Sequence, residues 1–566
     1  MDKPPTDEYL PGFGRGEDED DALSDQSESD GECFDVKDIP DVNRTFRKTP
    51  LWESKELPPY DDGKAGPNKD AMPDGFMSFT PLQIFLLLFP LDTWRSIVVQ
   101  TNLGVLRNQC GGAALTLHEL FVWVALQIMM MRAWSGAQDA YWQGTGAFDA
   151  SQYMSRRRFY WIKRYLRFSD AKQRVEPGEA GYDPLYLLRV LVDTFNFTFR
   201  KYWRLSEWVS LDEMMINFKG NNPFHRFVPR KPHPNGTKVH ALCDAVFYFC
   251  VAILVDDNST MTIPYIVNQL FEGNVVPGMH MITDRYYCCA ALVAYCVAKE
   301  VGLIGSTMAI RFMAKHAFSG WSKEEAKRKP RGTFEVATNA DKSVGCCIWK
   351  DKGMVRLTMT SSSTARTRVV RAERGKSRFK VWAPMAASEF DRYFHGVDRN
   401  DQLRGEGYGL ALCFRAMKYT IKMFMGLLDI VMSNSWIIWR VLHPKDRKRH
   451  RHWMNDLAAE MLIFNPDGDP VYRPRVSDAD ERHMCRPLAK TKRMRKGVEV
   501  MERKMGNCAM CSDLKNGIRH RSTMGCAECN VPLHPGRCHH DWHSLCNQQK
   551  RKKKTRRRSL LFESKE

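Results

Sequence analysis

The spacing of apolar side chains changes three times along the chain. Residues 1–75 are polar, acidic and rich in turn-forming residues, which predicts a disordered acidic tail and a linker. From Phe79 onward the apolar positions recur with a helical period, and Thr116 precedes Glu119 by three residues, the spacing of a helix-capping box. Between residues 207 and 255 the period becomes two, and three strands are predicted in EWVSLDEMMINFKG, TKVHALCDAV and FYFCVAILV.

A fourth predicted strand, MHMITDR, is followed by the apolar helix CCAALVAYCVAKEV. This order of strands and helix favours a mixed α/β sheet. Residues 311–385 are basic and turn-rich, with strand-like pieces such as CCIWK and VRLTMT, and predict an inserted subdomain. The last core helix expected is YTIKMFMGLLDIVMSNSWIIWRVL. Apolar runs such as FVWVALQIMMM are too short to cross a membrane, so no membrane partner is expected.

The net charge of +19 hides an asymmetry. Residues 1–38 carry 14 acidic side chains against Lys3, Arg15 and Lys37, so the remainder is more basic than the average indicates. A basic folded body favours a polyanionic partner, with nucleic acid as the first candidate. The alternative is a protein with many solvated surface lysines.

One predicted helix, SRRRFYWIKRYLRFSD, is both basic and aromatic. Its apolar residues Phe159 and Ile162 share a face, while Arg157 and Arg164 lie elsewhere on the helix. Such a helix could follow a DNA backbone through its arginines, or could simply pack its apolar face and leave a solvated basic side.

Four aspartates carry the chemistry. Asp212 and Asp284 interrupt or end short apolar strands, and Asp398 and Asp401 lie three residues apart in GVDRNDQLR, so that a helix would present both on one side. Carboxylates delivered from two strands and a helix could hold two divalent ions, as in-line phosphoryl transfer requires. Because Mg²⁺ prefers carboxylate and water oxygens, aspartates suit it.

The strings SLDEMMINFKG, RFVPRKPHPNGTKVHALCD, GVDRNDQLR and NSWIIW, which occur in this order along the chain, resemble the piggyBac-type transposases, as does the upstream block DPLYLLRVLVDTFNFTFRKYW. The resemblance extends from about Phe79 to Cys546. It implies an RNase H-like catalytic core in which Asp212, Asp284 and Asp398 form the metal-binding triad, with Asp401 as a further ligand or a supporting group. The implied cofactor is Mg²⁺ or Mn²⁺.

The same resemblance implies a nuclear cut-and-paste DNA transposase that cleaves double-stranded DNA at transposon ends, forms hairpins and joins them to TTAA targets, acting as a homodimer. One alternative is a domesticated DNA-binding descendant that does not cut, although such a role does not need the aspartates. A second alternative, a RING-type ubiquitin ligase, rests on the C-terminal cysteines alone and leaves residues 79–445 unexplained.

Three further side chains are candidate DNA contacts. Lys231 and Lys238 flank a Pro/Gly-rich loop and could contact phosphates or face solvent. Tyr419 occupies the approximate position of a tryptophan in the founding enzyme of the family and retains an aromatic face for stacking. The chain also departs from the family at His395, where a glycine is usual before GVD.

The C-terminal region has the spacing of zinc ligands. Six of the 17 cysteines fall between residues 508 and 546, and paired CxxC motifs followed by histidines favour Zn²⁺. Two ions need eight ligands; seven positions fit, and Cys546, His539 or His540 could supply the last. The candidates are Cys508, Cys511, Cys526, Cys529, His534, Cys538, His543 and Cys546. The resemblance implies a RING- or PHD-like cross-brace that binds transposon-end DNA, whereas the pattern alone also allows a protein-binding finger.

The segment Lys550–Arg558 has eight basic residues in nine. It could be a nuclear localisation signal, a DNA-binding arm or both.

The pattern and the resemblance together predict eight segments. They are an acidic tail and linker (1–75), a helical dimerisation and DNA-binding domain (76–205), an RNase H-like core in two parts (206–310 and 386–445) around an insertion subdomain (311–385), a basic linker or helical extension (446–504), a zinc finger (505–547) and a basic tail (548–566).

Overall fold

The computed structural model describes residues 46–133, 137–143, 146–229, 231, 233–259, 261–373, 377–405, 409–413, 418–469 and 471, and in the C-terminal region 485–487, 490–495, 498–503, 505–512, 519–526, 531–534 and 538. The chain divides into two compact units, one comprising Met1–Gly112 with Leu166–Leu457 and the other Ala113–Tyr165 with Ala458–Glu566. The helical domain predicted over 76–205 is therefore shared between the two units.

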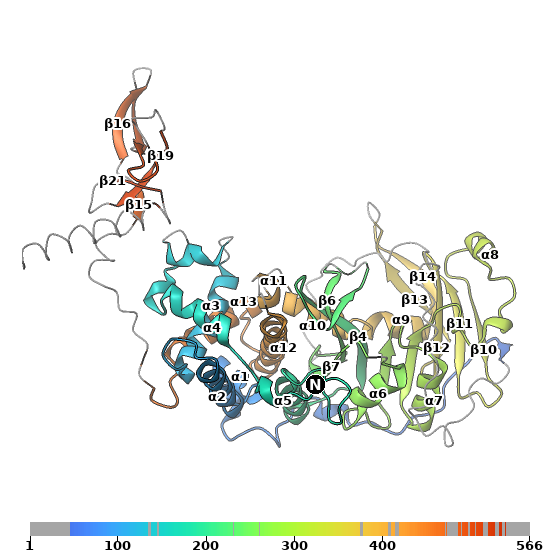
Figure 1. Cartoon of the computed structure of the whole chain (residues 1–566). Coiled ribbons are helices and arrows are strands. Elements are labelled where there is room, and N and C mark those ends of the chain that lie inside the picture. The colour runs from blue at the N-terminus through green and yellow to red at the C-terminus, as the bar shows by residue number, and fades with distance from the viewer. Residues whose placement is uncertain are drawn as a thin grey trace, which may run out of the picture. The chain divides into compact units, whose positions relative to one another are not determined.

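The first unit is built on a ten-stranded mixed sheet (Figure 1). The strand order is β1-β10-β11-β12-β9-β8-β4-β6-β5, and β7 also pairs with β6. Strands β4, β8 and β9 run parallel, and the other pairs are antiparallel. The strands are β1 (Arg47–Thr49), β4 (Trp208–Asn217), β5 (His225–Phe227), β6 (Asn235–Asp244), β7 (Cys250–Val255), β8 (His280–Thr283), β9 (Gly302–Ser306), β10 (Phe334–Thr338), β11 (Gly345–Lys350) and β12 (Met354–Met359).

The mixed α/β architecture expected from the sequence is confirmed. The four strands predicted between residues 207 and 285 correspond to β4, β6, β7 and β8, and helix α7 (Ala290–Ala298) follows them as expected. The sequence pattern did not reveal β9, β5 or helix α6 (Ile263–Phe271), which complete this half of the sheet.

Three strands of the segment expected as an insertion subdomain extend the main sheet. Strand β12 pairs with β9, and β11 and β10 continue the ladder outward. Part of the predicted linker joins them, because β1 pairs with β10 and Trp52 is buried in the same core. Pairing in this way satisfies backbone groups that an open sheet edge would expose. Strands β13 (Arg366–Arg371) and β14 (Phe379–Pro384) form a separate hairpin.

Helices pack on both faces of the sheet. Ser210 and Ile216, on one face of β4, lie against α10 (Gly396–Gly405) and α12 (Tyr419–Leu442), where a Cβ on Gly396 or Gly426 would come within 2.8 and 2.7 Å of them respectively. On the other face, His240 of β6 bonds the hydroxyl of Tyr287, which precedes α7. The remaining helices of this unit include α1 (Pro81–Leu88), α2 (Leu91–Arg107), α5 (Arg189–Tyr202), α8 (Lys323–Arg328), α9 (Met385–Tyr393) and α11 (Leu410–Cys413).

Helix α12 is long and apolar enough to cross a membrane by length and composition, which the sequence analysis overlooked. Its apolar window is entirely buried within the protein. Helices α1 and α2 also pass this test as a bent pair, with a bend of 71°. Pro90 is the N-cap residue of α2 and lies at this bend.

The second unit contains α3 (Leu117–Arg132), α4 (Arg156–Tyr165) and the end of α13 (His450–Ile463). The predicted capping box at Thr116 and Glu119 is present. Glu119 also bonds the buried Arg158 of α4, at 2.6 and 2.9 Å. The C-terminal strands of this unit are β15 (Cys485–Pro487), β16 (Lys490–Arg495), β17 (Val498–Arg503), β18 (Gly506–Asn507), β19 (Arg521–Ser522), β20 (Met524–Cys526) and β21 (Val531–Pro532).

Candidate active site and metal centre

Strands β4 and β8 bring Asp212 and Asp284 to neighbouring positions. The two strands are parallel, and their ladder ends at the pair Leu211–Thr283. Asp212 and Asp284 are the next residues on each strand, so they lie side by side where β8 stops. Ligand sites of open α/β sheets form at such carboxyl ends of parallel strands.

Helix α10 adds the third aspartate. It packs on β4 and β6, and Asp398 lies in its first turn. The carboxylate of Asp398 acts electrostatically on both Asp212 and Lys231, which places it near Asp212. His395 Nδ1 lies 3.5 Å from Asp398 Oδ2. The three aspartates predicted from distant parts of the sequence therefore converge on one site.

Glu213 joins this cluster, which the sequence analysis did not expect. It pairs across the sheet with His240, and strand alternation starts its side chain on the face opposite Asp212. Its carboxylate nevertheless hydrogen-bonds the side chain of Asp212, and Lys231 Nζ lies 3.4 Å from its Oε1. Because β4 has no β8 neighbour beyond Leu211, both side chains can turn into the space beside the strand.

Burial and mutual repulsion perturb these carboxyl groups. Burial, together with the charges of Glu213 and Asp284, raises the pKa of Asp212 well above its usual value. Burial and Glu213 raise the pKa of Asp284 to about 6, although the backbone N–H groups of Tyr286 and Tyr287 oppose the shift. For Glu213, burial is outweighed by Lys231, Lys238 and the bond from Asp212, so its pKa is lowered. The cluster thus carries more negative charge than its nearby cations balance, and a divalent cation would relieve the excess.

The donor set fits hard divalent ions. All its ligand atoms are carboxylate oxygens, the type that Mg²⁺ and Mn²⁺ prefer. In the described part of the chain, these carboxylates do not form a group of three or more with ligand atoms all within 4.8 Å.

Asp401 has a different partner from Asp398. It bonds the guanidinium of Arg404, with an Nε–Oδ1 distance of 3.0 Å, and Arg404 also donates to the carbonyl of Met215 on β4 at 2.8 Å. The Arg404 side chain is only 7% exposed. Asp401 therefore balances a buried cation that ties α10 to β4, which is a supporting role.

Two asparagines from the quoted motifs also anchor α10. Asn400 Nδ2 donates to the carbonyl of Tyr248 at 2.8 Å and to Asn434 Oδ1 at 3.2 Å. Asn434, within the NSWIIW string, exchanges two bonds with the backbone of Cys250 on β7. The sequence motifs that contain these two asparagines supported the family resemblance, but the asparagines themselves were assigned no role. The position of Asn400, two residues after the candidate ligand Asp398, was the available signal.

The candidate DNA contacts lie in several environments. Lys231 lies within the carboxylate cluster, and its pKa is raised because Glu213, Asp212, Asp398 and Asp401 outweigh burial. Lys238 Nζ lies 3.9 Å from the centre of the Tyr286 ring.

The other three candidates are spread over two helices. Tyr419 begins α12 and packs edge-on against Phe224. Arg157 and Arg164 are both exposed on α4, which agrees equally with a DNA-facing and a solvated basic side.

Four of the predicted zinc ligands form a compact group near the C-terminus. The ligand atoms of Cys508, Cys511, His534 and Cys538 all lie within 4.8 Å of one another. Cys526 is buried in the same small core but lies outside this group. The grouping joins the first cysteine pair to the fifth and sixth ligands along the chain, as in a cross-brace. Cys529, His543 and Cys546 lie outside the described residues, as do residues 1–45 and the tail from Lys550.

Comparison with known families gives the class of protein. The family model described as "Transposase IS4" matches residues 80–436, which is more than half of the chain. The match covers all four candidate aspartates. The chain therefore belongs to this transposase family.

Two similar human proteins are named as derived from piggyBac transposable elements. The human piggyBac transposable element-derived protein 2 is 22% identical over 381 residues, covering 64% of this chain and 62% of the relative. The human piggyBac transposable element-derived protein 3 is 21% identical over 407 residues, covering 69% and 63% respectively. The chain thus spans a little over three fifths of the length of these relatives.

A solved structure shares the fold. The chain resembles the piggyBac transposase in a cryo-EM structure of its synaptic complex with hairpin DNA, with a TM-score of 0.58 and 19% identity. The similarity covers 70% of this chain and 82% of that one.

The two aspartates of α10 should differ in their effect on stability. Asp401→Ala leaves the buried guanidinium of Arg404 without its carboxylate, so we expect a loss of about 2 kcal/mol in the free energy of unfolding. Asp398→Ala removes a 39% exposed carboxylate from a crowded anionic cluster and should leave stability unchanged or higher. Urea denaturation of both variants measures the difference. Equal stabilities would contradict the supporting role of Asp401.

Proposed function

We propose that this chain is a cut-and-paste DNA transposase that performs metal-dependent strand cleavage and strand transfer. The observation that carries the proposal is that Asp212 and Asp284 lie buried side by side at the end of parallel strands, with the partly exposed Asp398 of α10 close to Asp212. In this proposal the part of the sheet around β4, β8 and β9 is an RNase H-like core. The three aspartates are its metal-binding triad.

Two Mg²⁺ or Mn²⁺ ions, when bound, would activate the attacking oxygen and stabilise the leaving 3′-oxygen of the DNA strand. The residues of the chain prepare the site for this. Burial of Asp212 and Asp284 excludes water and makes their charge a strong ligand for cations. Lys231 balances Glu213, and the bonds of Arg404 and Asn400 hold α10 so that Asp398 keeps its position.

The proposed substrate is double-stranded DNA. The basic body of the chain favours a polyanion, and the similar solved structure is titled as a complex with hairpin DNA. By analogy with the piggyBac type, we propose transposon ends and TTAA targets as substrates and a homodimer as the active form. Inverted repeats flanked by TTAA around the coding sequence would identify the DNA ends to use in assays.

A second candidate function is DNA binding without cleavage, as a domesticated derivative. The names of the human relatives, which describe proteins derived from transposable elements, favour this alternative. Retention of all three aspartates in one cluster argues against it, because binding alone does not need them.

Replacing each aspartate tests catalysis directly. Asp212→Ala, Asp284→Ala and Asp398→Ala should each reduce Mg²⁺-dependent cleavage of the flanking DNA to background, because each removes a metal ligand. Binding of the same DNA should change little, since no cation that contacts phosphate is lost. Gel-based cleavage and fluorescence-anisotropy binding assays measure the two effects. A variant that cuts at nearly the wild-type rate would remove that residue from the triad.

We further propose that the C-terminal region binds two zinc ions. Cys508, Cys511, His534 and Cys538 would hold one, and Cys526, Cys529, His543 and Cys546 the other. Cys508→Ser should lower the zinc content and unfold residues 505–547, because so small a domain is stabilised by metal more than by its core. Elemental analysis that finds less than one zinc per wild-type chain would refute this assignment.

We also propose that the chain acts in the nucleus and that Lys550–Arg558 is an import signal. Deleting these residues should shift a fluorescent fusion to the cytoplasm while purified protein binds DNA as before. If the segment instead contacts DNA phosphates, the deletion variant should bind DNA more weakly. The slope of its log DNA affinity against log salt concentration should then be smaller by up to ~0.9 per lost contact.

A further inference from the structure

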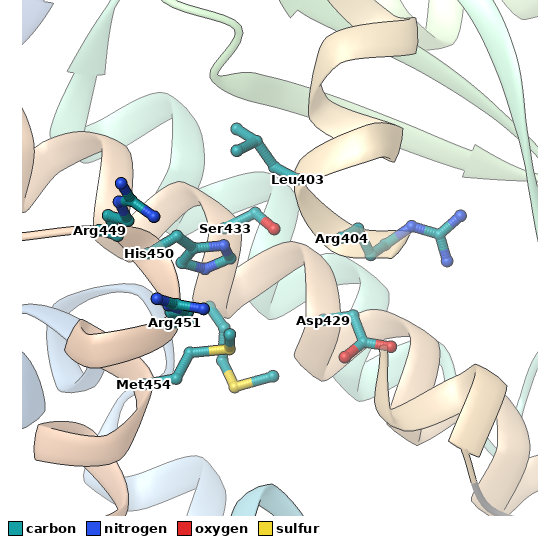
Figure 2. A pocket seen from close by; sticks show the side chains of 9 residues that line it. Leu403, Arg404, Asp429, Ser433, Arg449, His450, Arg451 and Met454 are labelled. Atoms are coloured by element: carbon teal, nitrogen blue, oxygen red, sulfur yellow. The ribbon is translucent and has the colours of Figure 1, made fainter. Parts of the chain in front are cut away.

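A cavity lies between three helices of the first unit, at the end of α10 away from Asp398. Its volume is roughly 220 Å³. Leu403 and Arg404 come from the end of α10, Asp429, Met432 and Ser433 from the middle of α12, and Arg449, His450, Arg451 and Met454 from the start of α13 (Figure 2). The cavity exceeds by many times the space that one water molecule needs.

The start of α13 makes one wall of the cavity electropositive. Helix α13 has 14 residues, and its first N–H groups have no acceptor within the helix, so this end carries partial positive charge. Arg449 and Arg451 flank His450 at this end and are exposed to solvent. Dipole and guanidinium groups together form the type of site that binds phosphate.

A buried hydroxyl on the opposite wall independently indicates a ligand. Ser433 is 0% exposed, and its Oγ has no hydrogen-bond partner among the residues that the structure describes. Figure 2 shows this hydroxyl between His450 and Arg404. An unpaired buried hydroxyl is costly in a folded protein, so its place in a cavity wall is explained if a bound group completes its bonding.

The acidic group in the cavity wall is already engaged. Both carboxylate oxygens of Asp429 accept backbone N–H groups at the start of α11, from Leu410 at 2.8 Å and Ala411 at 3.0 Å. Burial raises the pKa of Asp429 to about 7, which weakens its repulsion of an anion. Arg404 is likewise occupied by Asp401 and the carbonyl of Met215.

We propose that this cavity binds a backbone phosphate of the DNA strand that enters the active site, through Arg449, Arg451, the start of α13 and the hydroxyl of Ser433. The inference rests on the proposed function and specifies where the substrate is held. Leu403 lies five residues beyond Asp398 on α10, a rise of about 7.5 Å. Phosphates recur every ~3.4 Å along the axis of one strand, so the site would hold a phosphate about two nucleotides from the cleaved bond.

The test measures phosphate and DNA binding by the full-length protein. The variants are Ser433→Ala and Arg449→Ala/Arg451→Ala. The matched control is Lys445→Ala/Arg447→Ala, which removes the same charge from exposed residues outside the cavity. One probe is inorganic phosphate, monitored by the melting temperature against chloride of equal ionic strength. The other is a 20-base-pair duplex containing TTAA, monitored by anisotropy at several salt concentrations.

We expect phosphate to raise the melting temperature of the wild type and the control but not of the double-arginine variant. Duplex affinity should fall about tenfold in the double-arginine variant and less in the control, with a salt slope smaller by ~0.9 per lost contact. Ser433→Ala should melt at or above the wild-type temperature, since it removes an unpaired group, yet bind both probes more weakly. A purely structural serine would not show this combination.

Two results would overturn the proposal. If the cavity variants bind both probes as the wild type does, the cavity holds only solvent. If they lose the response to inorganic phosphate but bind the duplex like the control, the site takes free phosphate and not DNA. Loss of cleavage in the aspartate variants tests the proposed function separately, because neither binding measurement depends on catalysis.

Discussion

Close contact between helix α10 and strand β4 is the constraint from which the site follows. A side chain larger than hydrogen at residue 396 would collide with Ser210, so glycine permits the approach. Arg404 and Asn400 then bond backbone carbonyls of β4 and of the turn before β7. With the helix held at these points, Asp398 has one position relative to Asp212 and Asp284. Loosening the contact would separate the third carboxylate from the other two.

The charges of the clustered carboxyl groups determine what this arrangement can bind. The buried carboxyl groups of Asp212, Asp284 and Glu213 lie close to Lys231, with the partly exposed Asp398 beside them, and the pKa values of Asp212 and Asp284 are raised as a result. Such a cluster is unfavourable for stability by itself, because burial disfavours each charge and the charges repel. Perturbed groups gathered in this way are characteristic of functional sites. In a member of a transposase family, a site for divalent cations is the simplest explanation.

The cavity beyond Arg404 gives helix α10 a second charged site at its other end. One end of the helix carries an anionic site suited to cations, and the other end lies against a basic wall suited to anions. Arg404 lies between the anionic site and the basic wall, and its guanidinium bonds the carboxylate of Asp401 and the carbonyl of Met215. A DNA strand would need both types of site, one for its reacting bond and one for its backbone. Helix α10 would set the spacing between them.

Local patterns in the sequence were enough to predict many elements of this protein. The alternation of apolar and polar residues predicted β4, β6 and β7, and the capping box predicted the start of α3. The spacing of the cysteines predicted the candidate zinc ligands that lie close together around Cys508. These features depend on neighbours a few residues apart, so one stretch of chain contains the information. The candidate aspartates were found for a similar reason, because each lies in a short, distinctive string.

Features that depend on distant partners could not be predicted in this way. The pairing of β12 with β9 and of β1 with β10 merged a predicted insertion and a predicted linker into the main sheet, since an edge strand's partner is set by packing. Glu213 entered the carboxylate cluster because β8 ends beside it, and Arg404 acquired its role from a carbonyl 189 residues away. Residue type and spacing therefore specified which groups could do the chemistry. Long-range packing of strands and helices determined which of them meet, because only folding brings their charges and hydrogen bonds within reach.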